Sequence, residues 1–267
     1  MAIHSPLSTA DISKLLRKYD EVLKKEGEKK ADKVFEHAPI PSPQKKNKIN
    51  NKELLKTVQS GDIILWSGSS GISLKIRLSS DCPYSHASIV FKGALNKAEE
   101  GTKVVDVPRI FQSTWSKFRE DVDGKHSEVS RQVMLNDLSV VLRANEADGE
   151  PATLRILKCN ASERKSCTEK LASFIKDTDG HMYPGAKKGV PDFSSYLKGL
   201  KGIRIDHPSK FVCSELVAEA LLRMDVLKGK KAVNSYAPLN FTDKFYDKLK
   251  QQLKDGYGFG PETFVVR

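Results

Sequence analysis

Long apolar runs and a cleavable leader are both missing from this 267-residue sequence. No uninterrupted apolar segment reaches the ~18 residues that a membrane-spanning helix needs. The first residues, MAIHSPLSTADISK, contain no apolar stretch followed by a small-residue cleavage site, and Ala2 excludes N-terminal myristoylation. We therefore expect a cytoplasmic protein, and these absences leave open its delivery into another compartment or cell.

Cysteine is also scarce. The chain has four cysteines, at Cys82, Cys159, Cys167 and Cys213, and no two of them form a CxxC pair. The histidines do not stand at zinc-finger spacing from them. Scattered cysteines without a leader are typical of free thiols in a reducing compartment. The sequence thus predicts no metal site and no cofactor.

Negative charge is in the minority, with 34 Asp and Glu against 45 Lys and Arg and a net charge of +11. Such a surplus favours anionic partners, for example an acidic membrane surface. A basic protein without any such partner is an equally good interpretation. Aromatic residues make up 7% of the chain and do not interleave with a basic stripe, so a nucleic-acid partner is the weakest interpretation.

The N-terminal residues differ in texture from the rest. Apolar residues recur at helical spacing within 9–30, which Ser8 or Thr9 can cap, and basic residues occupy the opposite face. This helix could lie on an anionic membrane or dock on the rest of the protein, and docking is the simpler interpretation. Residues 38–50, with three prolines and three lysines, are typical of an extended linker.

We expect a basic helical extension and linker over 1–50 and one folded domain over 51–267. In that domain the apolar patterns predict mostly strands first and helices later. Strands are expected at 63–66, 86–92, 103–107, 109–114, 139–143, 153–158 and the final FVVR, helices at 51–58, 162–176, 190–199, 209–224 and 242–254, and a flexible loop at 67–73. This order favours an α+β fold with a mostly antiparallel sheet packed against helices.

Cys213 is the strongest candidate for chemistry. Pro208 and Ser209 are good first-turn and capping residues, so Cys213 falls in the first turn or two of the helix expected at 209–224. Free backbone N–H groups and the positive end of the helix dipole favour a thiolate there and can hold a developing oxyanion. Taken alone, this segment fits a small buried core cysteine better.

His86 opens a β-branched run beside a proline-containing loop. A histidine at the first residue of a strand can point into a cleft and accept a thiol proton near neutral pH. A third group must then fix the imidazole. Gln112, in the strand after His86, can do so with its amide oxygen. Asp106 and Ser113 are the alternatives, and Asp106 is the best carboxylate in this stretch.

Six segments follow one another in a recognisable order. They are GDIILW (61–66), SHASIV (85–90), IFQST (110–114), GHMYP (180–184), FVCSELV (211–217) and YAPLNF (236–241). This succession resembles the circularly permuted branch of the NlpC-type papain-like superfamily, which includes YiiX-like proteins and lecithin retinol acyltransferase relatives. In that branch the histidine strand precedes the cysteine helix. The resemblance covers about residues 58–245 and implies a permuted papain-like fold.

The resemblance also implies roles for individual residues. Cys213 matches the family's nucleophile, His86 its base, and Gln112 falls at its third polar residue, which is often His or Glu. Beside these we expect residues that line a substrate cleft: Tyr84, Ser85, Ser67, Gly68 and Ser214.

Together these residues predict a cysteine-dependent hydrolase or acyltransferase that forms a thioester acyl-enzyme. Its acyl substrate is a peptide-type amide or a lipid-type ester, because family members divide between the two. The alternative is a catalytically inert scaffold of the same fold whose basic N-terminal arm binds an anionic membrane or another partner.

Overall fold

One twisted sheet organises the protein. The computed structural model describes residues 8–95, 107–114, 132–184, 203 and 210–266. Within them, the sheet has the order β1-β9-β6-β2-β3-β4-β5. Its strands are Asn47–Asn50 (β1), Ile63–Trp66 (β2), His86–Phe91 (β3), Arg109–Ser113 (β4), Val133–Asp137 (β5), Ala152–Arg155 (β6) and Thr263–Val266 (β9). Apart from the parallel pair β1–β9, neighbouring strands are antiparallel, so the predicted α+β class is confirmed.

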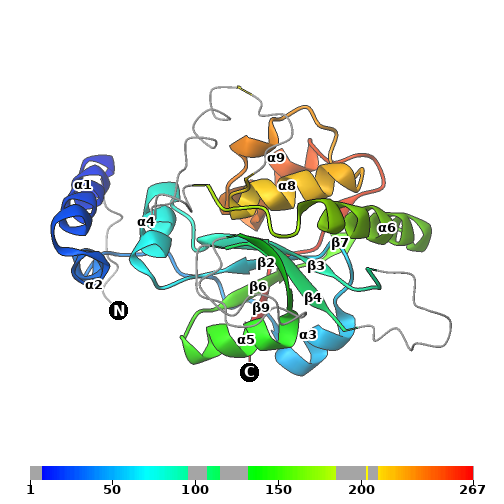
Figure 1. Ribbon diagram of the computed structural model, residues 1–267, viewed down its shortest axis with the longest axis horizontal. Coiled ribbons are helices and arrows are strands. Elements are labelled where there is room, and N and C mark those ends of the chain that lie inside the picture. Colours follow the sequence, from blue (N-terminus) through cyan, green and yellow to red (C-terminus); the bar gives the residue numbers. More distant parts are fainter. Residues whose placement is uncertain (1–7, 96–106, 115–131, 185–202, 204–209, 267) are drawn as a thin grey trace.

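Helices cover both faces of this sheet (Figure 1). On one face lie Ala161–Thr178 (α6), Cys213–Arg223 (α8) and Tyr246–Lys250 (α9), and on the other lie Asn51–Thr57 (α3) and Leu138–Ala147 (α5). Each face has its own core: Ile89 packs on the α6 and α8 side, and Val90 on the α3 and α5 side. Burial on both faces explains why 63–66 reads as an unbroken apolar run.

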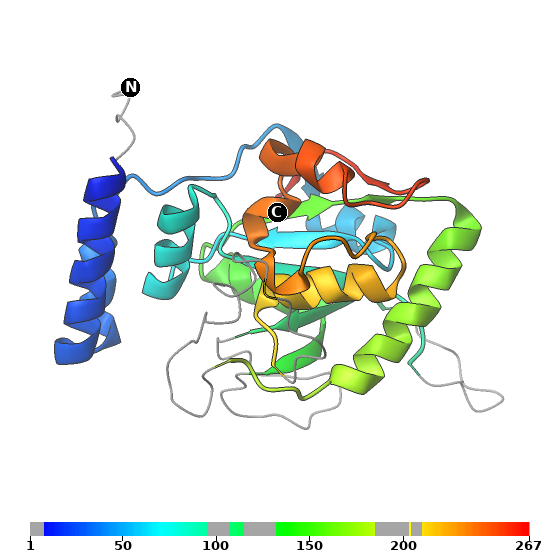
Figure 2. The ribbon, with the colours of Figure 1, turned by 90° about the horizontal axis from the view of Figure 1, so that it is seen from above.

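The N-terminal segment packs on the rest of the protein. Thr9–Glu26 (α1), capped by Ser8, and Glu28–Asp32 (α2) lie beside Gly71–Ser80 (α4) at one end of the molecule (Figure 2). Tyr19 and Phe35 stack there, with Leu78 in the same apolar cluster. The apolar face of α1 is therefore turned toward the protein. The helix expected over 9–30 is interrupted at Gly27, whose φ is +83°.

Two sequence predictions are wrong. Residues 139–143, expected as a strand, belong to α5, because the Asp137 carboxylate caps this helix by accepting from the N–H groups of Ser139 and Val140. The β-branched pair in this stretch is what favoured a strand. Within 67–73, expected as a flexible loop, Ser70 caps α4 and the helix begins at Gly71.

Other boundaries differ by less. α8 begins at Cys213, four residues after the expected start, and the proposed caps Pro208 and Ser209 lie outside the described residues. The helix expected at 242–254 consists of a 3-10 turn, Asp243–Phe245, followed by α9. The strand expected at 153–158 is split into β6 and the short Leu157–Lys158 (β7), which pairs with Gly258–Phe259 (β8). The elements expected at 190–199 and over most of 103–107 lie outside the described residues.

Candidate active site

The sheet opens between β3 and β4, and this opening positions the candidate site. The two strands pair from Phe91↔Arg109 to Ile89↔Phe111 and no further. Each strand nevertheless keeps its outer partner, β3 as far as His86↔Trp66 and β4 as far as Ser113↔Val133. The backbone groups of Ala87 and Ser113 that face the opening do not pair with each other, so they are available to bind another part of the chain.

The segment that leads into α8 fills this opening. Ser113 Oγ donates to the carbonyl oxygen of Phe211, 2.5 Å away. The backbone N–H of Ala87 donates to the Cys213 sulfur and lowers the pKa of that thiol. Cys213 is thus the first residue of α8 and lies against Ala87, the residue after His86. It is buried, with 4% of its surface exposed.

Burial dominates the electrostatics of the thiol. It raises the pKa of Cys213 to about 11, against the opposing effect of the N–H groups of Ala87, Ser214 and Cys213 itself. The nearby Glu215 carboxylate raises it further. The helix N-terminus acts in the direction that the sequence indicated, but it does not outweigh desolvation, so the resting sulfur is a neutral thiol.

His86 and Gln112 form the pair that the sequence predicted to meet. His86 Nε2 lies 2.9 Å from Gln112 Oε1, and Gln112 Nε2 donates to Asn136 Oδ1 at 3.1 Å. Because the amide oxygen can only accept, Nε2 carries the imidazole proton and Nδ1 keeps its lone pair. Burial lowers the pKa of His86 to about 4, while the hydrogen bond that His86 donates to Gln112 acts in the opposite direction. The resting imidazole is therefore neutral.

The thiol and the imidazole reach the end of β3 from different sides. Side chains alternate along a strand, and Ala87 and Ile89 belong to the α8 side. His86 by alternation shares the other side with Val90. The described hydrogen bonds include none between the Cys213 sulfur and the His86 ring, so transfer of the thiol proton requires the two side chains to approach each other at the end of the strand.

The alternatives to Gln112 can now be placed. Ser113 uses its hydroxyl on Phe211 and does not contact His86. Asp106 lies outside the described residues. Gln112 is fully buried. Among the candidates in the described part of the chain, its side chain is the one that forms a hydrogen bond with His86.

The residues expected to line a cleft are buried and bonded within the protein. Ser67 Oγ donates to the Pro83 carbonyl at 2.6 Å, Gly68 N–H donates to Ser85 Oγ at 3.0 Å, and Ser214 Oγ donates to the Tyr236 carbonyl at 2.7 Å. These bonds hold the loop before His86 and the first turn of α8 in place. They give Ser67, Gly68, Ser85 and Ser214 a supporting role at the edge of the site.

Tyr84 also differs from its expected position. Its side chain is fully buried, and its hydroxyl lies 3.1 Å from Thr153 Oγ1 and 2.6 Å from Glu262 Oε2. Burial and the Glu262 carboxylate both raise the pKa of this phenol. The structure therefore gives Tyr84 a packing role in place of the expected cleft position.

Tyr183 is a neighbour of the thiol that residue chemistry did not single out. It forms a small buried cluster with Val212 and Cys213. Burial raises the pKa of Tyr183 well above its ordinary value, and an ionised Cys213 and the Glu215 carboxylate act in the same direction. The GHMYP segment was noticed as part of an ordered set, but nothing in its composition placed its tyrosine beside Cys213.

Comparisons with known proteins give little beyond this geometry. No family model and no curated protein matches the chain. Among solved structures, the crystal structure of metalloprotein yiiX from Escherichia coli O157:H7 matches with a TM-score of 0.40 and 18% sequence identity, over 78% of this chain and 97% of that chain. This is a weak structural similarity to a YiiX-like protein. We therefore base the site on the residues of this chain.

Two further properties concern ligands and membranes. No group of three or more His, Cys, Asp and Glu side chains that could hold a metal ion occurs in the part of the chain that the structure describes. None of the described helices has the length and the apolar character needed to cross a bilayer.

Proposed function

We propose that this protein is a cysteine-dependent acyl-transfer enzyme, with Cys213 as nucleophile, His86 as general base and Gln112 as the residue that orients His86. One observation carries the proposal. The His86 imidazole donates through Nε2 to Gln112 Oε1, 2.9 Å away, and keeps Nδ1 as an acceptor, while the Cys213 thiol lies against the backbone N–H of Ala87. Orienter, base and nucleophile are the parts that covalent acyl transfer requires.

The mechanism starts from two neutral groups. With a thiol pKa near 11 and an imidazole pKa near 4, a thiolate–imidazolium pair does not form in the resting protein. His86 Nδ1 therefore accepts the proton as Cys213 attacks the substrate carbonyl carbon. Hydrogen bonds between catalytic groups often tighten only in the substrate complex, which suits a site whose two side chains are not yet bonded.

The first turn of α8 supplies the second requirement, which is stabilisation of the tetrahedral oxyanion. The N–H groups of Cys213 and Ser214 lie against the sulfur and favour its charged form, although the resting thiol is neutral. As the sulfur bonds to carbon and its proton passes to His86, negative charge develops on the carbonyl oxygen, and the same N–H donors can stabilise it. His86 then protonates the leaving amine or alcohol, and water or another nucleophile releases the acyl group from the thioester.

We propose a peptide-type amide or a lipid-type ester as the acyl substrate. The test is a substrate panel that contains both classes, assayed with wild type, Cys213→Ala and the control Cys159→Ala. Cys159 is a partly buried cysteine. Turnover that disappears only in Cys213→Ala supports the proposal, and turnover that survives in Cys213→Ala rejects it.

A second candidate function rests on α1. Its exposed face carries basic residues whose side chains point away from the docked apolar face: Lys14, Arg17, Lys18, Lys24 and Lys25. This face could bind an anionic membrane by charge alone, because the apolar face is covered. Sedimentation with phosphatidylserine vesicles, compared with neutral vesicles and with Lys14→Glu/Lys18→Glu protein, tests it. Equal sedimentation in all three cases rejects it.

A further inference from the structure

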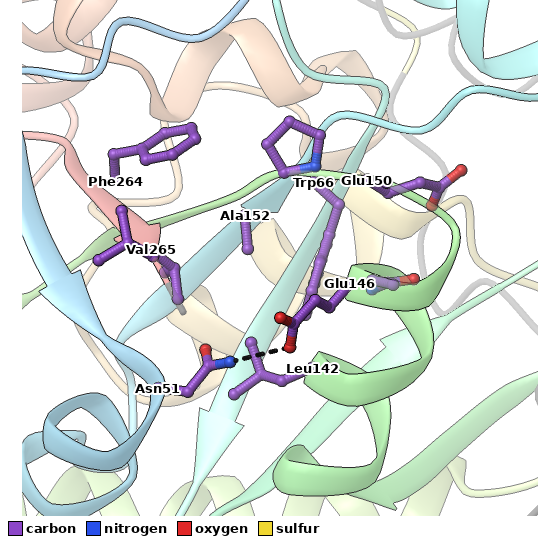
Figure 3. A pocket seen from close by; sticks show the side chains of 12 residues that line it. Asn51, Trp66, Leu142, Glu146, Glu150, Ala152, Phe264 and Val265 are labelled. Carbon is purple, nitrogen blue, oxygen red and sulfur yellow. Dashed lines mark hydrogen bonds between the residues drawn. The ribbon is translucent and has the colours of Figure 1, made fainter.

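A pocket lies on the α3 and α5 face of the sheet (Figure 3). It has a volume of about 370 Å³. Strands β2, β6 and β9 form its floor with Trp66, Ala152 and Val265, and Leu142 of α5 forms one wall. Because these side chains are apolar, the pocket suits the hydrocarbon part of a ligand.

A buried amide opens into this pocket. Asn145, with 6% of its surface exposed, lines the pocket from α5. Within the described residues the Asn145 side chain makes no hydrogen bond. Its amide atoms remain accessible to solvent. A buried amide normally finds a partner. The pocket is the place where a ligand can supply one.

The rim of the pocket is acidic. Glu146 accepts from Asn51 Nδ2 at 3.4 Å, and Glu150 accepts from the N–H and hydroxyl of Ser69 at 2.7 and 3.0 Å. Both carboxylates line the pocket, and no lysine, arginine or histidine is among the described lining residues. The rim of the pocket thus carries negative side chains, whereas the protein as a whole has a net charge of +11.

We propose that this pocket binds the side chain of a lysine residue presented by a peptide. The four-carbon stem packs on Trp66, Leu142 and Ala152, and the ammonium group donates to the Asn145 amide oxygen and to the Glu146 carboxylate. The Glu150 carboxylate, on the opposite side of the rim, adds to the attraction for a positive charge (Figure 3). The ammonium group has three N–H donors, so it can serve both acceptors and keep one donor for water. Next to the pocket, Lys45 already places its ammonium over the ring of Phe264, 5.5 Å from the centroid, so this rim tolerates positive charge.

The inference is independent of the cysteine chemistry. Trp66 of β2 is the cross-strand partner of His86 of β3, so the pocket and the candidate active site lie on neighbouring strands, but no pocket residue takes part in the proposed reaction. Binding is therefore measured with both wild type and Cys213→Ala protein, and a failure of catalysis leaves the binding result intact.

The experiment is calorimetric titration with the peptide acetyl-Ala-Lys-Ala-amide and with the same peptide acetylated at the lysine ε-amine. We expect binding of the free amine and at least tenfold weaker binding of the acetylated peptide, because acetylation removes the charge. Ala152→Phe, which fills the pocket, should abolish binding, and Asn145→Leu should weaken it about tenfold.

Two surface variants guard against a folding defect. Glu146→Gln should weaken binding about threefold to tenfold, since it keeps the shape of the side chain and removes its charge. Glu169→Gln, an exposed residue of α6 on the other face of the sheet, makes the same charge change and should leave affinity unchanged. No binding of the free amine, equal affinity for both peptides, or equal effects of Glu146→Gln and Glu169→Gln would overturn the proposal.

Discussion

Ser113 Oγ donates to the carbonyl oxygen of Phe211, and this bond joins the end of β4 to the segment that carries Cys213. Both partners are buried and lie 98 positions apart in the sequence. The bond takes the place of the missing β3–β4 pairing at the opening of the sheet. It therefore fixes the first turn of α8 relative to the strand that holds Gln112.

Ser113→Ala should destabilise the protein by about 1–3 kcal/mol, because it leaves a buried carbonyl without its donor. Urea denaturation measures the change. The control is Ser79→Ala, an exposed serine of α4 that donates only to the Ile76 carbonyl of its own helix. Equal losses in the two variants would mean that the Ser113–Phe211 bond is not a tether.

Gln112→Leu should lower kcat/KM about tenfold to a hundredfold, because His86 and Asn136 lose their shared partner and the ring is no longer held. Gln112→Glu should behave differently. A carboxylate beside the ring raises the pKa of His86, so the acidic limb of the pH–rate profile should move to higher pH. A Gln112→Leu enzyme with unchanged kcat/KM, or a Gln112→Glu profile without that movement, would remove Gln112 from the site.

The stability of the protein should depend on the protonation of His86. Its pKa is about 4 in the folded protein, against an ordinary value of 6.5, so the unfolded chain binds more protons between these values. Stability should therefore fall as the pH drops from about 6.5 to 4. His86→Gln should lack this contribution, and denaturant titrations of both proteins at several pH values measure the difference. Parallel curves would show that folding does not lower the pKa of the half-buried His86 ring.

Cys213 should produce the opposite slope at alkaline pH. Its thiol has a pKa of about 11 when folded and an ordinary value of 9.0, so the folded protein holds the proton more firmly in this range. Stability should fall as the pH rises from about 9 to 11. Cys213→Ala should make this slope shallower but not remove it, because burial also raises the pKa of the Cys82 thiol, to about 12, and Cys159→Ala, at a less buried cysteine, should change the slope less. The same denaturant titrations, extended to alkaline pH, check the result.

Gly61 should tolerate alanine far less well than Gly149. Both have positive φ, +91° and +71°, so both substitutions strain the backbone. At Gly61 a Cβ would also lie 2.7 Å from Leu157 Cδ2 and 2.8 Å from Met224 Cε, whereas nothing lies within 4 Å at Gly149. We expect Gly61→Ala to lose about 1–3 kcal/mol more. Thermal unfolding of the two variants tests this, and equal losses would contradict the packing at Gly61.

Periodicity predicted the elements that have a strong pattern. β2 and β3 are apolar on both faces, and α6 has caps and spacing that agree, so these elements were predicted within a residue or two. α5 was not, because its β-branched residues favour a strand when the cap at Asp137 is not weighed. In this segment the β-branched residues favour a strand and the Asp137 cap favours a helix. Packing of the segment against the sheet decides for the helix.

For the candidate site, the sequence could predict the meeting of His86 and Gln112 but not the state of the thiol. The helix N-terminus and burial shift the pKa of Cys213 in opposite directions, and only the depth of burial decides which is larger. Tyr84 illustrates the same limit. Its position two residues before His86 favoured a place in the cleft, while its hydroxyl in fact bonds Thr153 and Glu262, far away in the sequence.

The most direct test of the central claim is acylation by p-nitrophenyl acetate. The account predicts a burst of nitrophenolate equal to the amount of enzyme, with one acetyl group on Cys213 in the mass spectrum of the digested protein. The burst should be absent in Cys213→Ala, strongly slowed in His86→Ala and unchanged in Cys159→Ala. Acetylation spread over Cys159, Cys167 and Cys213 at similar rates, with no effect of His86→Ala, would contradict it.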